Sequence, residues 1–166
     1  ADIYTVIASN ASGCSRSNTH SVFVATSSPV ITAGGPTTFC TPGSVLLTAT
    51  APGPWLWNNG ATTQSITVTT SVTRTVSNGC ISSPVIITAV APPGTFTPTS
   101  NSPVCVGNTL NLFANSSGAT SYVWAGPNGY ASLIQNPSIL TAPAIAAGSY
   151  TVVASNSAGC SGSSQL

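Results

Sequence analysis

Few side chains in this sequence could act as an acid, a base or a metal ligand. The 166 residues include one aspartate (Asp2), one histidine (His20) and two arginines (Arg16 and Arg74), with no lysine and no glutamate. Acid–base catalysis needs a well-placed proton donor or acceptor, and a calcium site needs several carboxylates. His20 has no second histidine or glutamate to act with, and we expect it to be an exposed strand residue. The sequence therefore predicts no enzyme, no metal site and no cofactor.

The same scarcity of charge limits the partners. Two arginines cannot form the basic patch that binds phosphates, so nucleic acid is not an expected partner. No apolar run approaches the roughly 20 residues that cross a bilayer, so no membrane span is expected either. What remains is the chemistry of five cysteines and of the aromatic and hydroxyl side chains.

A segment that ends in Gly-Cys occurs three times in the chain. Residues 150–160 and 4–14 match at Tyr, Thr, Val, Ala, Ser, Asn, Gly and Cys, and residues 74–80 form a shorter copy. The alternating side chains predict a half-buried strand that runs into a polar turn. The copies lie too far apart for a solenoid repeat, and their spacing is typical of small domains in tandem.

The cysteines predict disulfide bonds. Cys14, Cys80 and Cys160 end the three copies, whereas Cys40 and Cys105 each precede an apolar strand. Pairing within each repeat predicts Cys40–Cys80 and Cys105–Cys160 bonds, and it leaves Cys14 for a partner upstream of the chain. Zinc is the rival interpretation, but there is no C-x-x-C pair and only one histidine. Disulfides in small β domains of low charge indicate a compartment outside the cytoplasm.

The composition predicts an all-β fold. Apolar residues make up 42% of the chain, enough to bury a core, and Val, Ile and Thr occur in short runs punctuated by Gly and Pro. We expect residues 1–25 to be the last hairpin of a truncated domain, followed by domains at 29–91 and 95–166, the latter with an incomplete last strand. Short linkers at 26–29 and 91–94 separate them. The predicted strands span residues 3–9, 21–25, 30–33, 44–50, 54–57, 65–69, 73–77 and 85–90.

Several phrases are similar to a known family. A Cys before the second strand, a Trp on the third and Ala-Ala-Gly148-Ser-Tyr150 opening the sixth resemble an immunoglobulin-type (Ig) sandwich. With Trp57-Asn-Asn-Gly-Ala-Thr-Thr-Gln-Ser-Ile66, the chain resembles the Ig-like and PKD-like repeats of large secreted surface proteins of Bacteroidetes-type bacteria. The resemblance implies tandem Ig-like β-sandwiches in the stalks of adhesins, often exported by the type IX route. Because the cysteines lie in turns, and not within strands as in antibody domains, each disulfide is expected at one end of its sandwich.

The large aromatic residues have two interpretations. Trp57 and Trp124 are expected to fill the cores of their sandwiches. Trp55 and Tyr130 lie on or beside the same strands, where an exposed planar ring could stack on a sugar and neighbouring hydroxyl groups could bind it. The first pair therefore predicts core packing, and the second pair marks a candidate glycan contact.

Taken together, these features predict a structural role. We expect Ig-like repeats strung end to end as the stalk or filament of a secreted cell-surface adhesin, whose partners are neighbouring repeats and other copies of the protein. The alternative is an array of carbohydrate-binding modules, with surface glycans as partners. A third interpretation is a fibre in which incomplete domains exchange strands. Asn10 and Asn115 begin Asn-x-Ser sequences, which are glycosylation acceptors by rule, although the rule often does not apply to bacterial proteins.

Overall fold

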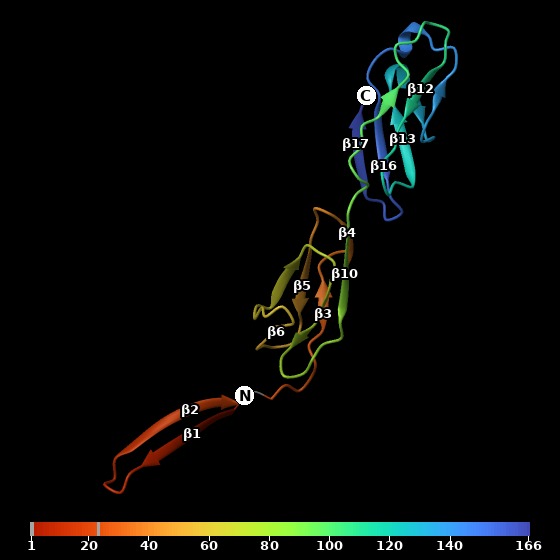
Figure 1. Ribbon diagram of the computed structural model, residues 1–166. Helices are drawn as coiled ribbons and strands as arrows, with labels where there is room; N and C mark the ends of the chain where they lie inside the picture. The colour runs from red at the N-terminus through yellow and green to blue at the C-terminus, as the bar shows by residue number, and fades with distance from the viewer. Residues whose placement is uncertain (1, 23) are drawn as a thin grey trace. The chain divides into compact units, whose positions relative to one another are not determined.

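The computed structural model describes residues 2–22 and 24–166, and over these residues the chain has seventeen β-strands and two single-turn 3-10 helices (Figure 1). The predicted all-β class is therefore confirmed. Backbone contacts divide the chain into two compact units. The first comprises Ala1–Thr37, Val45–Val68 and Val72–Ile87, and the second comprises Thr38–Ser44, Thr69–Ser71 and Thr88–Leu166.

A hairpin opens the chain. Strand β1 (Asp2–Ser9) pairs antiparallel with β2 (Ser15–Val22), and the side chains of both strands are exposed. The sequence predicts the returning strand at 21–25, but it begins at Ser15, because the turn before it is tight and the polar residues of β2 give no alternating pattern. Phe23, inside that predicted strand, lies outside the described residues. The assignment of the hairpin to a truncated domain stays a prediction.

The first unit contains the strands of one sandwich. Alternate side chains of a strand point to opposite faces, so the Val, Leu and Ile positions of these strands gather on one side. One sheet has the order β3 (Ile31–Ala33), β5 (Val45–Ala49) and β7 (Ser65–Val68), and β6 (Leu56–Trp57) pairs with β9 (Val76–Ser77). The buried apolar side chains of this unit are Val45, Leu47, Ala49, Trp57, Ile66, Val68, Val76 and Ile87.

The second unit contains a more complete sandwich. One sheet has the order β11 (Thr99–Ser100), β12 (Leu110–Phe113) and β15 (Ser138–Ile139). The other has the order β14 (Ala131–Ser132), β13 (Ser121–Ala125), β16 (Thr151–Ser155) and β17 (Ser161–Gln165). The 3-10 turns η1 (Pro127–Gly129) and η2 (Ala144–Ala146) lie in the connections.

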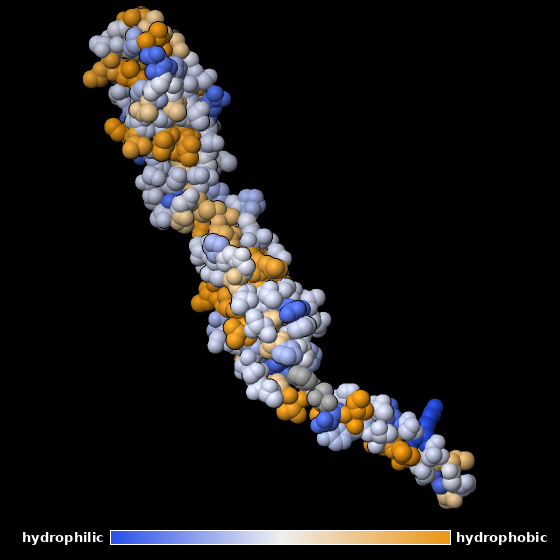
Figure 2. Space-filling model, turned by 180° about the vertical axis from the view of Figure 1, so that it is seen from behind, coloured by the Kyte–Doolittle hydropathy of each residue, from blue (hydrophilic) through white to orange (hydrophobic). Residues whose placement is uncertain are grey.

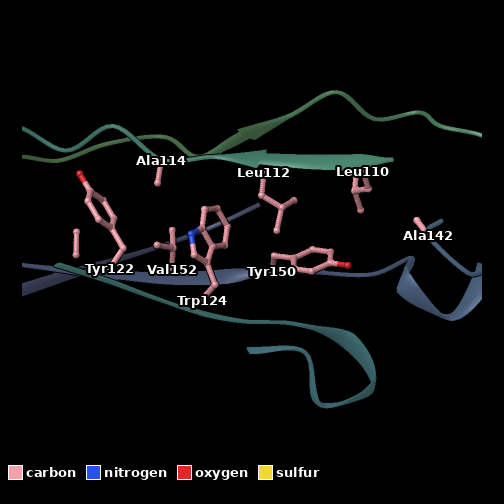
Figure 3. Close-up of a cluster of buried hydrophobic side chains, with 9 residues drawn as sticks. Leu110, Leu112, Ala114, Tyr122, Trp124, Ala142, Tyr150 and Val152 are labelled. Atoms are coloured by element: carbon pink, nitrogen blue, oxygen red, sulfur yellow. The ribbon is translucent and has the colours of Figure 1, made fainter. Parts of the chain in front are cut away.

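The core of this sandwich is formed between β12 on one side and β13 and β16 on the other. In Figure 3, Leu112 and Ala114 face Trp124 and Val152 across the core. Trp124, Leu112 and Val152 are completely buried. Two facing sheets of this kind, with alternating side chains between them, form an Ig-like sandwich.

Strand β10 (Val85–Val90) pairs with two short strands. The sequence predicts β10 with the same bounds. The predicted strand at 73–77 is in fact two strands, β8 (Val72–Arg74) and β9, because the chain changes partners at Thr75 and only β8 pairs with β10. Strand β4 (Thr38–Cys40) is not among the predicted strands, and it runs parallel to the end of β10. Three residues between prolines are too few to show alternation.

The surface is weakly polar. In Figure 2, most of the visible face is pale, with small separate patches of apolar colour and few strongly hydrophilic residues. This follows from a chain that is rich in Ser, Thr, Ala and Gly and has only 2% charged residues. Exposed large apolar side chains include Ile81, Ile86, Leu133 and Leu140. Such a surface provides little charge repulsion between molecules.

Candidate functional site: the Cys40–Cys160 disulfide

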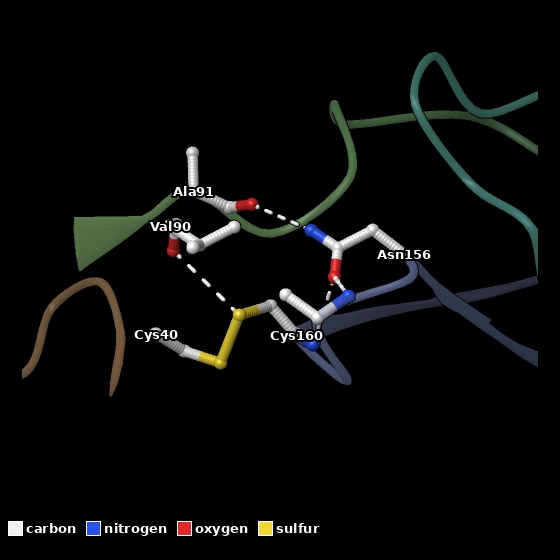
Figure 4. The surroundings of a disulfide bond; sticks show 6 residues. Cys40, Val90, Ala91, Asn156 and Cys160 are labelled. Carbon is white, nitrogen blue, oxygen red and sulfur yellow. Dashed lines mark hydrogen bonds between the residues drawn. A yellow bond between two sulfur atoms is a disulfide. The ribbon is translucent and has the colours of Figure 1, made fainter. Parts of the chain in front are cut away.

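The chain has a disulfide bond between Cys40 and Cys160, which are separated by 120 residues (Figure 4). Their Cα atoms lie 5.5 Å apart, within the range that a disulfide requires. Cys40 follows a half-buried Phe39 and is itself exposed, whereas Cys160 is only 2% exposed. Both residues belong to the second compact unit.

This bond corrects the predicted pairing. The sequence predicts Cys40–Cys80 and Cys105–Cys160, but Cys80 and Cys105 are free thiols, as is Cys14. The prediction assumes that the two cysteines of one repeat lie at the same end of its sandwich. They lie at opposite ends.

The position of Cys105 shows why it cannot reach Cys160. Cys105 lines the same groove as Leu110 and Ala146, and Ala146 accepts a hydrogen bond from the hydroxyl of Tyr150, which directly precedes β16. Cys160 follows the far end of β16, beyond Ser155. A strand advances about 3.3 Å per residue, so the two thiols are separated by on the order of 15 Å. Disulfide geometry allows no such span.

The same reason applies to Cys40 and Cys80. Cys40 lies opposite Val90, the last residue of β10, whereas Cys80 precedes Val85, the first residue of that strand. The length of β10 therefore separates them, again on the order of 15 Å. In both predicted pairs the two cysteines therefore lie too far apart for a disulfide.

The turn that carries Cys160 is organised by Asn156. The Asn156 side-chain oxygen accepts hydrogen bonds from the backbone N–H groups of Ala158 and Cys160, both at 3.0 Å. The backbone N–H of Gly159 donates to the carbonyl of Asn156 at 3.0 Å. Gly159 has a φ of 81°, a conformation that costs little only for glycine. The Asn and Gly of the repeated segment therefore fix the direction of the cysteine that follows them.

The first copy of the segment folds into the same turn. The side-chain oxygen of Asn10 accepts from the backbone N–H groups of Ser12 and Cys14, at 3.1 and 2.9 Å. Gly13 has a φ of 83° and donates to the carbonyl of Asn10 at 3.0 Å. The turn is thus a property of the local sequence, because it forms both where the cysteine is bonded and where it is free.

Strand β4 holds the other cysteine. Its residues Phe39 and Cys40 lie opposite Ala89 and Val90 of β10, and the next N–H, that of Thr41, donates to the Val90 carbonyl at 2.9 Å. The sulfur of Cys160 lies 3.7 Å from that carbonyl oxygen. A disulfide sulfur has no hydrogen to donate, so this approach is a packing contact. Val90 therefore contacts both halves of the disulfide.

The aromatic residues differ in exposure. Trp57 and Trp124 are almost completely buried, and their indole N–H groups donate to the carbonyls of Thr63 and Gln135 at 2.8 and 3.1 Å. Trp55 is half-buried, and its indole N–H donates to the carbonyl of Ala51 at 2.8 Å. This bond fixes the ring of Trp55 against its own loop.

Tyr130, the second candidate glycan contact, packs edge-on against Tyr150 with 5.6 Å between ring centres. The hydroxyl of the buried Tyr150 donates to the carbonyl of Ala146 at 2.7 Å. Burial, and after it the neighbouring Tyr130, raise the pKa of Tyr150 above its usual value of 10.0. Trp55 and Tyr130 belong to different compact units.

The ionisable residues are few. His20 and Arg16 are exposed on β2, and Arg74 makes one long contact, 3.5 Å, with the side-chain oxygen of Asn58. No cluster of three His, Cys, Asp or Glu side chains that could hold a metal ion occurs among residues 2–22 and 24–166. Within the same ranges, no helix is long and apolar enough to cross a membrane.

Comparison with known proteins supports the fold. No family model and no curated protein matches the chain. Among solved structures, the N-terminal eight Ig domains of Down Syndrome Cell Adhesion Molecule (DSCAM) align with 99% of this chain, at 16% identity and a TM-score of 0.53, over 30% of the DSCAM chain. The FN1–FN3 domains of chicken CNTN1 align at 11% identity and a TM-score of 0.35, covering 99% of this chain and 76% of theirs, too low to support any conclusion. The DSCAM likeness shows an Ig-like fold and nothing more.

Proposed function

We propose that this chain is a non-catalytic structural segment, a run of Ig-like repeats in the stalk or filament of a secreted bacterial cell-surface adhesin. The observation that carries the proposal is the disulfide between Cys40 and Cys160, which closes a loop of 120 residues around the predicted linker 91–94. A pull on the two ends of the chain would pass through this bond and not through the linker. A covalent tie of this kind suits a segment that carries load.

The thermodynamic effect of the bond supports the same role. On the chain-entropy model, closing a loop of this length stabilises the folded state by about 5 kcal/mol. The bond would also require an oxidising compartment during folding, which agrees with secretion. The resemblance to repeats of bacterial surface proteins supports the cell-surface location.

The surface chemistry supports association with other copies. A nearly neutral surface rich in Ser and Thr produces little long-range repulsion, so that neighbouring chains can approach closely. The partners that we propose are therefore neighbouring repeats of the same protein and other copies in a filament.

Force spectroscopy on single molecules tests the load-bearing role. The full chain is pulled from its two ends, oxidised and as the Cys40→Ser variant. The variant is expected to gain about 400 Å of additional contour length, because Cys40 and Cys160 are 120 positions apart in the sequence and each position extends the chain by roughly 3.5 Å. Cys105→Ser is the matched control and should keep the length of the oxidised chain. Equal lengths for the oxidised chain and Cys40→Ser would contradict the proposal.

The location is tested separately. Antibodies raised against this chain are expected to label intact cells that produce the whole protein. Labelling that requires permeabilised cells would exclude a surface adhesin, whatever the pulling experiment shows.

A further inference from the structure

Cys105 occupies the same place in its repeat as Cys40 does in the preceding one. Cys40 lies five residues before the buried Val45, and Cys105 lies five residues before the buried Leu110. Each cysteine is exposed and follows a half-buried apolar residue. Cys40 is bonded and Cys105 is a free thiol.

Cys80 likewise occupies the place of Cys160. The backbone N–H of Cys80 donates to the side-chain oxygen of Asn78 at 3.3 Å, as that of Cys160 donates to Asn156. The two asparagines also use their amide groups alike. Asn156 donates to the carbonyl of Ala91 at 2.9 Å, and the buried Asn78 donates to the carbonyl of Ser27 at 3.3 Å.

These carbonyls belong to the two predicted linkers, 91–94 and 26–29. The Gly79-Cys80 and Gly159-Cys160 turns are therefore each held against the linker that precedes their own repeat. In the second unit, the residue before Ala91 is Val90, which contacts Cys40 and Cys160. The first unit shows the same approach, since Gly79 lies against Ala25, next to that linker. Cys80 is thus placed for a Cys40-type partner on a preceding repeat.

An open groove of about 350 Å³ lies beside Cys105. It is lined mainly by apolar residues, among them Pro103, Val104, Leu110, Ala142 and Ala146. Residues 103–105 correspond to β4, which in the preceding repeat is paired with the end of β10 and bonded to the Cys160 turn. The groove marks the side of the second sandwich where an equivalent partner would lie.

We propose that Cys105 and Cys80 each form a disulfide with a neighbouring repeat, of the same kind as the bond between Cys40 and Cys160. Cys105 takes the part of Cys40 in one such bond, and Cys80 takes the part of Cys160 in another. Cys105 accepts the Gly-Cys turn of a following repeat, and Cys80 supplies the turn cysteine for a preceding one. Successive repeats are then joined by a series of disulfides, each between neighbours and none within a repeat. The inference rests on the proposed repeat organisation and not on the adhesin role.

Formation of each bond is a two-electron oxidation. Two thiols lose their hydrogens and form one sulfur–sulfur bond, while an external disulfide takes up two electrons and two protons and is reduced to two thiols. Oxidised glutathione supplies this reaction in the test.

The test extends the chain by one repeat in register. Leu166 pairs with Tyr150 in the last repeat, as Val85 pairs with Arg74 in the preceding one. Leu166 therefore takes the place of Val85, and a second copy of residues 86–166 placed after Leu166 continues the last strand. This extension adds one further Cys105 and one further Cys160. The extended chain is refolded with oxidised and reduced glutathione, alkylated without reduction, and its free thiols are counted by intact mass.

The extended chain is expected to gain one disulfide while the number of free thiols stays the same as in the original chain. Replacing the first Cys105 with serine should abolish the new bond, whereas replacing the second Cys105 should leave it intact. The proposal is overturned if the extension gains two free thiols and no disulfide, or if the first Cys105→Ser variant keeps the new bond.

A second variant needs no extension. In Cys40→Ser the partner of Cys160 is absent, so Cys105 and Cys160 of one repeat are both free. They are expected to stay unpaired under the same redox buffer, because they lie at opposite ends of their sandwich. An intramolecular Cys105–Cys160 bond in this variant would overturn the proposal, even if the extended chain failed to fold. The numbers of free thiols and disulfides in these experiments do not depend on where the protein is located in the cell. Antibody labelling tests that location separately.

Discussion

Asn156 donates a hydrogen bond from its side-chain amide to the backbone carbonyl of Ala91, 2.9 Å away and 65 residues earlier in the chain. The same side chain accepts two bonds inside its own turn through its oxygen. One residue therefore shapes the turn that aims Cys160 and also fixes that turn against the segment next to Val90. Asparagine is suited to both tasks because its amide group carries a donor and an acceptor.

The Asn156→Asp variant separates these two roles. Aspartate keeps an acceptor for the turn, but it has no N–H for Ala91 and places a carboxylate against a carbonyl oxygen. We expect a loss of about 1–2 kcal/mol in the free energy of unfolding, measured in urea at neutral pH. Asn10→Asp is the matched control, because both side-chain bonds of Asn10 lie within its own turn. It should change stability by less than about 0.5 kcal/mol. Equal losses in both variants would contradict the role of the amide.

The disulfide itself is expected to dominate the stability of the chain. Cys40→Ser should lower the free energy of unfolding by about 2–5 kcal/mol, since the unfolded chain regains the freedom of the loop. Cys105→Ser and Cys14→Ser replace exposed free thiols and should stay within about 0.5 kcal/mol of the parent. Denaturation of the oxidised proteins measures the difference. A parent that unfolds at the same midpoint with and without reductant would show that the bond adds nothing.

The loss of stability on replacing a tryptophan should depend on how deeply its ring is buried. Trp124→Ala removes a completely buried ring whose N–H bonds to Gln135, and it is expected to cost about 3–5 kcal/mol. Trp55→Ala should cost less, because its ring is half-exposed, although it too loses a hydrogen bond. Thermal unfolding measures both.

Trp55→Ala also tests the alternative function. The parent chain is expected to show no saturable binding on a glycan array. Saturable binding that disappears in Trp55→Ala would favour a carbohydrate-binding module over a structural segment.

Much of the fold is readable from local pattern. Val45, Leu47 and Ala49 alternate with exposed or half-buried residues, so the strand at 44–50 is predicted to within a residue of its observed ends. The recurrence of Asn and Gly before Cys predicts a common turn, because both residue types have a local reason to be there. These features depend on neighbours in the sequence, which a sequence displays directly.

The disulfide could not be found in that way. Its position depends on β4, a three-residue strand without a periodic pattern, and on its parallel pairing with the end of β10. Pairing by repeat joins Cys40 to Cys80 because both belong to the repeat at residues 29–91. The length of β10 keeps them apart, and strand length matters only once the strands are assembled. One sequence signal was available, namely that each repeat has one cysteine before its second strand and the other after its sixth.

The last prediction concerns alkaline pH. The chain has one aspartate and one histidine, so its melting temperature should be nearly constant between about pH 5 and 9. Burial and the neighbouring Tyr130 raise the pKa of Tyr150 above 10.0 in the folded state. Above pH 10 the unfolded chain therefore releases the Tyr150 proton, which the folded chain keeps. This release stabilises the unfolded state relative to the folded state. The contribution of Tyr150 to stability is complete below about pH 10 and is lost as the pH rises through the folded pKa.

Melting curves at pH 7, 9 and 11, recorded after alkylation of the free thiols, check this. The parent should melt at the same temperature at pH 7 and 9 and at a lower one at pH 11. Tyr150→Phe loses the hydrogen bond to Ala146 and should melt lower at every pH, but with a smaller drop between pH 9 and 11. Tyr4→Phe, at an exposed position of β1, is the matched control and should keep the drop of the parent. An unchanged drop in Tyr150→Phe would mean that alkaline destabilisation arises elsewhere in the chain.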